Sequence, residues 1–199
     1  MRHGNTTQDH MALLKACTKK KDLFKGTRLH KDIIKRGLLE KNPYIACSLI
    51  SMFVKCGALG KAEAVHAELP IRDTVSWNAL IAGYTQQGQR KEALDLFESM
   101  KSEGYSPDAV TFTCILKACG KTKNVQMGKQ IHEEIINMGL LEKDVVLGGA
   151  VVDMYGKCGA PGKAQKAFEE LPERNVVSWT SIIDSYSREG LVHQAMECF

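Results

Sequence analysis

Apolar residues recur three and four positions apart in short stretches of this chain, which is the period of an amphipathic helix. Residues 74–108 hold two such stretches, separated by Gly88. We expect Ser76 to cap the first helix, because a hydroxyl oxygen accepts a hydrogen bond from a free backbone N–H of the first turn. Gly104 and Pro107 follow the second stretch and should end that helix. The pattern predicts a helical hairpin.

The same pattern returns at an offset of 102 residues. Five strings recur in one register: 15–17 as 117–119, 37–41 as 139–143, 55–57 as 157–159, 68–70 as 170–172 and 75–77 as 177–179. Such agreement indicates an array of units, which buries apolar faces between neighbours and leaves a concave surface open. We therefore look for function on that surface and not in an enclosed pocket.

The array divides into six repeats that follow an N-terminal extension at residues 1–6. The repeats are residues 7–42, 43–73, 74–108, 109–144, 145–175 and 176–199, with lengths of 36, 31 and 35 residues recurring. We expect an all-α fold, a right-handed α-solenoid of stacked helix-turn-helix repeats. The last unit stops partway through its second helix, which indicates a segment of a longer array.

Composition is that of an ordinary globular chain, with 44% hydrophobic and 25% charged residues. No apolar run reaches the length of a membrane span, so we expect no contact with a membrane. The residues before the first unit are too few for a targeting peptide. Any such signal should lie outside this chain.

Basic residues gather at the N-terminal end of the chain, where residues 1–42 hold 11 Lys and Arg against 4 Asp and Glu. Five of them could contact phosphates: Lys19, Lys20, Lys21, Lys25 and Arg28. The alternative is a solvated helix face that keeps the array soluble. Charge alone does not separate the two.

The seven cysteines lack the spacing of a metal site, because no CxxC pair exists. Cys17 and Cys119 are equivalent across the 102-residue period, as are Cys56 and Cys158. One structural role is thus used twice, and we expect reduced thiols packed in helix seams.

Residues 132–134 read His-Glu-Glu, which is half of a zinc deaminase signature. The second half, a downstream P-C-x-x-C that supplies two thiolates, is absent. We therefore expect His132 to lie on a helix surface. No nucleophile elbow, phosphate-binding loop or acidic pair is present either. The sequence predicts no enzyme, metal, cofactor or small-molecule substrate.

Two stretches carry a family resemblance, VSWNALIAGY at residues 75–84 and ALDLFESM at residues 93–100. They resemble the pentatricopeptide-repeat family. The strings LKAC at 116–119 and DMYGKCG at 153–159 resemble the long and short repeat types of its plant subclass, in which long, short and standard repeats alternate. The resemblance covers the chain from residue 7 onward and identifies it with part of an organellar RNA-editing-type factor.

The resemblance implies sequence-selective binding of single-stranded RNA, one base per repeat. In this family the fifth and last residues of each repeat read the base. Carried onto this chain, the pairs are Met11 with Asn42, Cys47 with Asp73, Asn78 with Asp108, Thr113 with Asp144, and Gly149 with Asn175, while Thr180 stands alone. The second residues, which sandwich the bases, are Val75, Val110, Val146 and Val177.

By the family's code, Asn78 with Asp108 favours uracil, and Thr113 with Asp144 resembles a guanine-preferring pair. Met11, Cys47 and Gly149 depart from the usual polar choice, so their units are expected to act as spacers or to contact another protein. The resemblance further implies a mitochondrial or chloroplast location, a role in C-to-U editing or other RNA processing, and organellar processing or editing proteins as partners. A scaffold that binds proteins through the same concave surface is the alternative.

Overall fold

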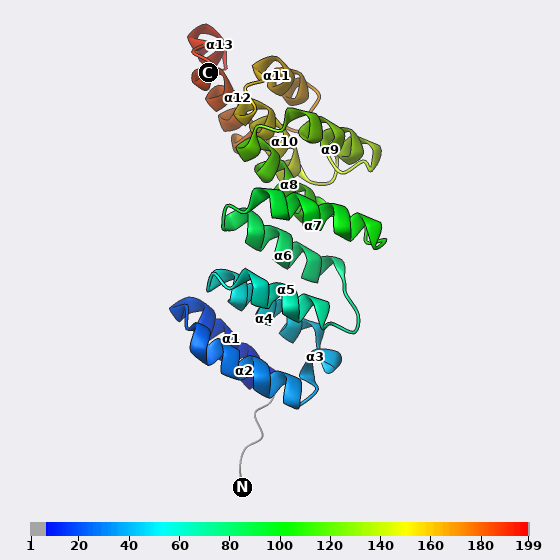
Figure 1. The fold of residues 1–199 in the computed structure, drawn as a ribbon. Coiled ribbons are helices and arrows are strands. Elements are labelled where there is room, and N and C mark those ends of the chain that lie inside the picture. The colour runs from blue at the N-terminus through cyan, green and yellow to red at the C-terminus, as the bar shows by residue number, and fades with distance from the viewer. Residues whose placement is uncertain (1–6, 199) are drawn as a thin grey trace. The chain divides into compact units, whose positions relative to one another are not determined.

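The structure is a computed structural model that describes residues 7–198. The N-terminal extension expected at residues 1–6 lies outside this range, as does Phe199. Within it the fold is all-α, with thirteen helices and no strand (Figure 1). No helix in the described part is long and apolar enough to cross a membrane. The chain divides into two compact units, and the boundary between them in the sequence lies between Ser106 and Pro107.

The first unit contains three helical pairs and one short extra helix. Its helices are α1 (Thr7–Lys20), α2 (Leu23–Lys35), α3 (Leu38–Lys41), α4 (Pro43–Lys55), α5 (Leu59–Ala67), α6 (Thr74–Gln86) and α7 (Arg90–Ser102). The first helices of successive pairs pack on one another, α1 on α4 and α4 on α6. This unit therefore has a layer of first helices, against which the second helices pack.

The second unit repeats this plan. Its helices are α8 (Ala109–Thr122), α9 (Val125–Asn137), α10 (Val145–Lys157), α11 (Pro161–Glu169), α12 (Val176–Arg188) and α13 (Val192–Glu197). Again the first helices form one layer, with α8 on α10 and α10 on α12. Across both units, a helix begins at the first residue of every repeat expected from the sequence.

Close approach of neighbouring repeats depends on a glycine and a methionine. A Cβ atom at Gly26 of α2 would collide with the thioether sulfur of Met52 on α4. The equivalent pair in the second unit, Gly128 on α9 and Met154 on α10, shows the same collision. A larger residue would have to displace the methionine side chain, and the 102-residue period preserves both members of the pair.

Helix α6 corrects the expectation that Ser76 caps it. The cap is Asp73, whose Oδ1 accepts a hydrogen bond from the backbone N–H of Ser76 at 2.7 Å. In return the Ser76 hydroxyl oxygen accepts from the backbone N–H of Asp73 at 3.2 Å. Together these bonds form a capping box, with Ser76 as the third residue of the helix. Thr111 and Ser178 play the same part in α8 and α12.

His132 is another correction, because it is buried and does not lie on a helix surface. Its side chain is 8% exposed, and its Nδ1 lies 3.2 Å from the hydroxyl of Tyr155. Burial lowers the pKa of His132. In the first unit His30 takes the equivalent place against Phe53, with ring centroids 5.5 Å apart. Both histidines hold a second helix against the first helix of the next repeat.

Candidate nucleic-acid interface

The last residue of each complete repeat is the N-cap of the next repeat's first helix. Each side-chain oxygen accepts from a backbone N–H two or three residues further on, at distances of 2.7–3.1 Å. The five capping residues are Asn42, Asp73, Asp108, Asp144 and Asn175. These positions therefore have a structural role that is independent of any ligand.

The fifth residues of the repeats differ in exposure. Asn78 on α6 is 8% exposed, whereas Met11, Cys47 and Thr113 are half-buried. Thr180 on α12 is exposed, and its hydroxyl donates to the Val176 carbonyl oxygen at 2.7 Å. The expected base-reading positions are thus not equally accessible.

Gly149 is closed over by the next repeat. A Cβ atom placed on Gly149 would lie 2.9 Å from Cγ1 of Val177, the expected base-sandwiching residue of the sixth repeat. The fifth position of this repeat therefore has no side chain, and one placed there would have to displace Val177. Asn175, the last residue of the same repeat, donates through Nδ2 to the Val145 carbonyl oxygen at 3.3 Å. This hydrogen bond links the start of α12 to the start of α10.

The second residues of the repeats form an exposed apolar series. Val75, Val110, Val146 and Val177 are between 49% and 59% exposed. Tyr44 holds the same place in the second repeat and is 73% exposed. Sequence reasoning did not include this aromatic ring, although the repeat register alone would have found it. An exposed aromatic face can stack on a base.

A hollow of about 540 Å³ opens between α1 and α4. It brings together two fifth positions, Met11 and Cys47, with the ring of Tyr44 and three lysines. The lining residues are Met11, Lys15, Thr18, Lys19, Tyr44, Cys47, Ser48, Ser51 and Lys55. The hollow therefore combines an apolar floor, hydroxyl groups and positive charge on the layer of first helices.

The three lysines of this hollow recur in the second unit. Lys15, Lys19 and Lys55 correspond to Lys117, Lys121 and Lys157 across the 102-residue period. Only Lys19 was singled out from the sequence. In the second unit Lys157 forms an ion pair with Asp153 on α10. The first unit has Ser51 at the place of Asp153, so Lys55 keeps its charge available within the hollow.

A smaller hollow of about 200 Å³ joins the expected base-reading pair of the second repeat. It is lined by Cys47 and Asp73 together with Leu39, Glu40, Ala46, Leu69, Pro70, Ile71 and Ser76. Burial, and then the nearby Asp73 carboxylate, raise the pKa of the Cys47 thiol. Asn78 lies in the first unit and Asp108 in the second.

The cysteines are free thiols. Cys17 and Cys119 are buried in the first helices, and burial raises the pKa of Cys119 to about 12. Such a thiol stays protonated at neutral pH, which makes it a poor nucleophile. Among the described residues, no three His, Cys, Asp or Glu side chains are grouped to hold a metal ion.

Models of one protein family match parts of this chain. A model described as the PPR repeat family matches residues 72–121, and one described as a PPR repeat matches residues 110–140, 149–176 and 177–199. Together they match more than half of the chain.

Among the curated relatives, a chloroplastic pentatricopeptide repeat-containing protein of Arabidopsis thaliana is 37% identical over 94% of this chain and 30% of its own length. A mitochondrial one from the same plant is also 37% identical, over 94% of this chain and 27% of its own. The chain thus spans less than a third of these relatives.

Among the solved structures, the pentatricopeptide repeat protein PPR10 from maize aligns with all of this chain and 29% of its own, with a TM-score of 0.78 and 20% identity. PPR10 in complex with an 18-nt psaJ RNA element aligns with 97% of this chain and 29% of its own, with a TM-score of 0.73 and 20% identity. At this identity the likeness shows the fold.

Proposed function

Since the chain belongs to the pentatricopeptide-repeat family, we propose that it is a binding module for single-stranded RNA. One observation carries the proposal, namely the hollow between α1 and α4. There an exposed aromatic ring, the fifth residues of two repeats and three lysines share one surface. Cations bind phosphates and aromatic rings stack on bases, so this combination suits a single strand and not a duplex.

The division of labour within the module follows from exposure and charge. Tyr44 and the second-position valines supply apolar faces for bases, while Lys15, Lys19 and Lys55 neutralise phosphates. We propose that Asn78 with Asp108 selects uracil and that Thr113 with Asp144 selects guanine. Gly149 carries no side chain for a base, so its repeat acts as a spacer.

A larger role follows from the relatives, several of which carry chloroplastic or mitochondrial names. We propose that the protein acts in an organelle and specifies a site for C-to-U editing or another RNA-processing step, with processing proteins as partners. Sequencing of organellar transcripts from plants that lack the gene would separate the two. Loss of C-to-U conversion at a few sites supports editing, whereas altered transcript ends support processing.

Binding of short single-stranded oligonucleotides at low salt tests RNA recognition directly. Tyr44→Ala should weaken binding by about 1–3 kcal/mol, the usual contribution of one aromatic stacking contact. Tyr44→Phe keeps the ring and is the matched control. Because Tyr44 is largely exposed, neither variant should change the melting temperature. Equal affinities for wild type and Tyr44→Ala would contradict stacking here.

Base selection requires variants that preserve the helix caps. Asn78→Ala with Asp108→Ser removes the proposed uracil pair but leaves an oxygen to cap α8. The wild type should prefer oligouridine over oligoadenosine of equal length, and the variant should lose that preference while it retains salt-dependent binding. A chain that binds no RNA but binds other helical proteins would favour the scaffold alternative.

A further inference from the structure

We propose that the bound RNA does not end in the hollow between α1 and α4, called the groove below, but continues around the α1–α2 turn onto helix α2. There a base stacks on Phe24 and phosphates lie against Lys25 and Arg28. The proposal rests on the proposed RNA-binding function and adds a second contact surface to it. We call the residues Lys20, Lys21, Phe24, Lys25 and Arg28 the turn surface.

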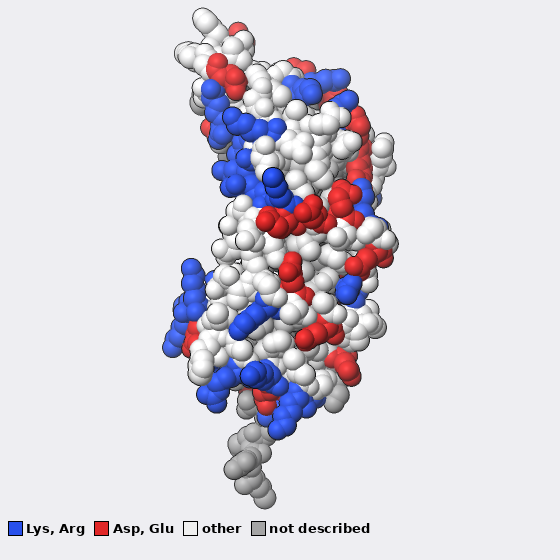
Figure 2. Space-filling view, viewed as in Figure 1, with Lys and Arg blue, Asp and Glu red and all other residues white. Residues whose placement is uncertain are grey.

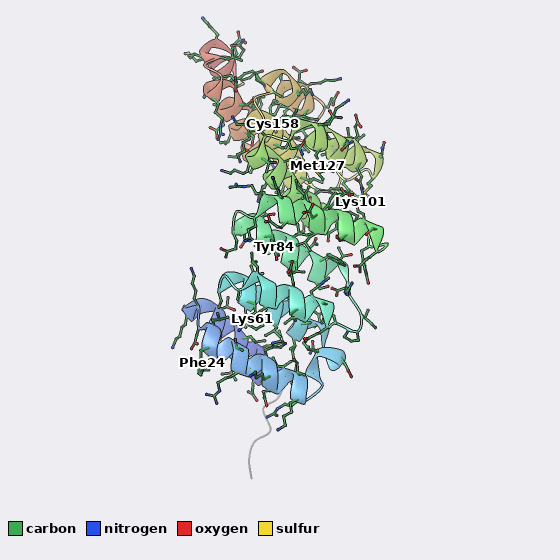
Figure 3. The ribbon with its side chains drawn as sticks, in the orientation of Figure 1. Phe24, Lys61, Tyr84, Lys101, Met127 and Cys158 are labelled. Carbon is green, nitrogen blue, oxygen red and sulfur yellow. The ribbon has the colours of Figure 1, made fainter. Side chains whose placement is uncertain are left out.

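Phe24 is an aromatic side chain with no place in the core. It is 77% exposed and projects from the start of α2 (Figure 3). Beside it lies a hollow of about 530 Å³, lined by Asp22, Phe24, Lys25, Arg28, Leu29 and Asp32. An exposed ring next to cations in a concave surface is the arrangement that holds unpaired bases.

The two carboxylates in this hollow are already engaged. Asp22 caps α2, accepting a hydrogen bond from the backbone N–H of Lys25 at 2.9 Å. Asp32 accepts from His10 Nε2 and from Arg36 Nε, each at 2.9 Å, and these bonds lower the pKa of Asp32. Across residues 7–198, no ion pair involves Lys25 or Arg28. Their charge remains available to an anion.

The turn surface is continuous with the groove. A hollow of about 80 Å³ at the end of α1 is lined by Ala16, Cys17, Lys20, Asp22 and Lys25, and it shares Asp22 and Lys25 with the hollow beside Phe24. Lys19, which precedes Lys20 on α1, lines the groove between α1 and α4. Figure 2 shows a column of Lys and Arg side chains at the edge of the molecule where α1 turns into α2. Cations therefore mark an unbroken path from one face to the other.

The second copy of this helical pair shows that the scaffold does not require these residues. Buried positions are kept across the 102-residue period, with Gly26 matched by Gly128 and Ile33 by Ile135. The exposed positions change. Phe24, Lys25 and Arg28 correspond to Gln126, Met127 and Gln130. The aromatic ring and the two charges are thus a property of the first repeat and not of the fold.

The backbone of the α1–α2 turn has the same conformation in both copies. Lys21 lies in the left-handed region with φ of 52°, where glycine is favoured because it has no Cβ. Its equivalent Lys123 has φ of 54°, so this strained conformation belongs to the repeated turn and not to a ligand site. The Lys21 side chain stands at the point where the path crosses from α1 to α2.

Binding of two single-stranded RNAs tests the proposal: an oligouridine of about six nucleotides, which matches one base per repeat, and one of about fourteen, which can also reach the turn. Phe24→Ala with Lys25→Ala and Arg28→Ala should weaken binding of the longer RNA about 10-fold or more, given the usual effect of one stacked base. Binding of the shorter RNA should stay within about twofold. The salt dependence should fall by about 0.7 in log–log slope for each lost phosphate contact.

A matched control changes Gln126, the counterpart of Phe24 in the second unit, and two lysines elsewhere. Its substitutions are Gln126→Ala, Lys91→Ala and Lys129→Ala. This variant should leave the difference between the two RNAs unchanged. Crosslinking of a 4-thiouridine oligonucleotide should in addition mark the peptide that contains Phe24. If the turn variant weakens both RNAs equally, or if the crosslinks stay on α1 and α4, the path onto α2 is wrong while RNA binding stands. If neither RNA binds the wild type, RNA binding itself fails.

Discussion

The backbone N–H of Ser76 donates to Oδ1 of Asp73 at 2.7 Å, so a residue proposed to read RNA also starts helix α6. The same holds at every last position of a complete repeat. A capping carboxylate needs one oxygen for the helix, while recognition of a base needs a further acceptor or donor. Asp and Asn can meet both requirements, and they occupy all five positions.

Asp73 should therefore affect stability and binding separately. Asp73→Ala should lower the free energy of unfolding by about 1 kcal/mol, because α6 loses its cap. Asp73→Asn and Asp73→Ser keep a capping oxygen and should stay within about 0.5 kcal/mol of wild type. Urea denaturation followed by circular dichroism measures all three. If Asp73→Ala is as stable as Asp73→Asn, the cap contributes nothing and the position is free for ligand binding alone.

Gly149 should resist the introduction of a base-reading side chain. Gly149→Asn should destabilise the second unit by about 1–3 kcal/mol, the usual effect of forcing atoms into a packed seam. The contact responsible is with Val177, so Val177→Ala should recover much of the loss in the double variant. A double-mutant cycle in urea denaturation measures the coupling. Additive effects would show that Val177 does not close the position.

The all-helical fold could be predicted from the sequence, because glycines, prolines and apolar spacing carry that information locally. The cap of α6 was misassigned to Ser76, since Asp and Ser are equally good caps and only the backbone decides between them. Burial of His132 depends on Tyr155 in the next repeat, which no local pattern reveals. The groove and the turn surface required knowledge of which helix faces pack together.

Lys21 and its equivalent Lys123 provide a matched pair for the turn. Both lie in the left-handed region, with φ of 52° and 54°. Lys21→Gly and Lys123→Gly should each stabilise the fold by about 0.5–1 kcal/mol, the relief of strain less the extra flexibility of glycine in the unfolded chain. Only Lys21→Gly should weaken binding of the longer oligouridine. Thermal unfolding and RNA titration together check this. Equal RNA affinities for the two variants would remove Lys21 from the turn surface.

His66 should make the first unit sensitive to acid. Its ring packs against Trp77 with centroids 4.4 Å apart, and burial, followed by the nearby Arg72 guanidinium, lowers its pKa to about 4. In the unfolded chain the pKa returns to about 6.5, so the unfolded state binds the extra proton between these values. Stability is therefore full above about pH 6.5 and falls by at most about 3 kcal/mol as the pH drops to 4.

His66→Phe keeps a buried ring and removes the titrating group. Urea midpoints measured from pH 7 to pH 4 should decline less steeply for this variant than for wild type. His30 and His132 also have lowered pKa values through burial, so part of the decline should remain. His193→Phe makes the same substitution at an exposed position of α13 and should leave the urea midpoint at pH 7 unchanged. If the curves for His66→Phe and wild type are parallel, His66 has the same pKa in the folded and unfolded states, and the expectation is wrong.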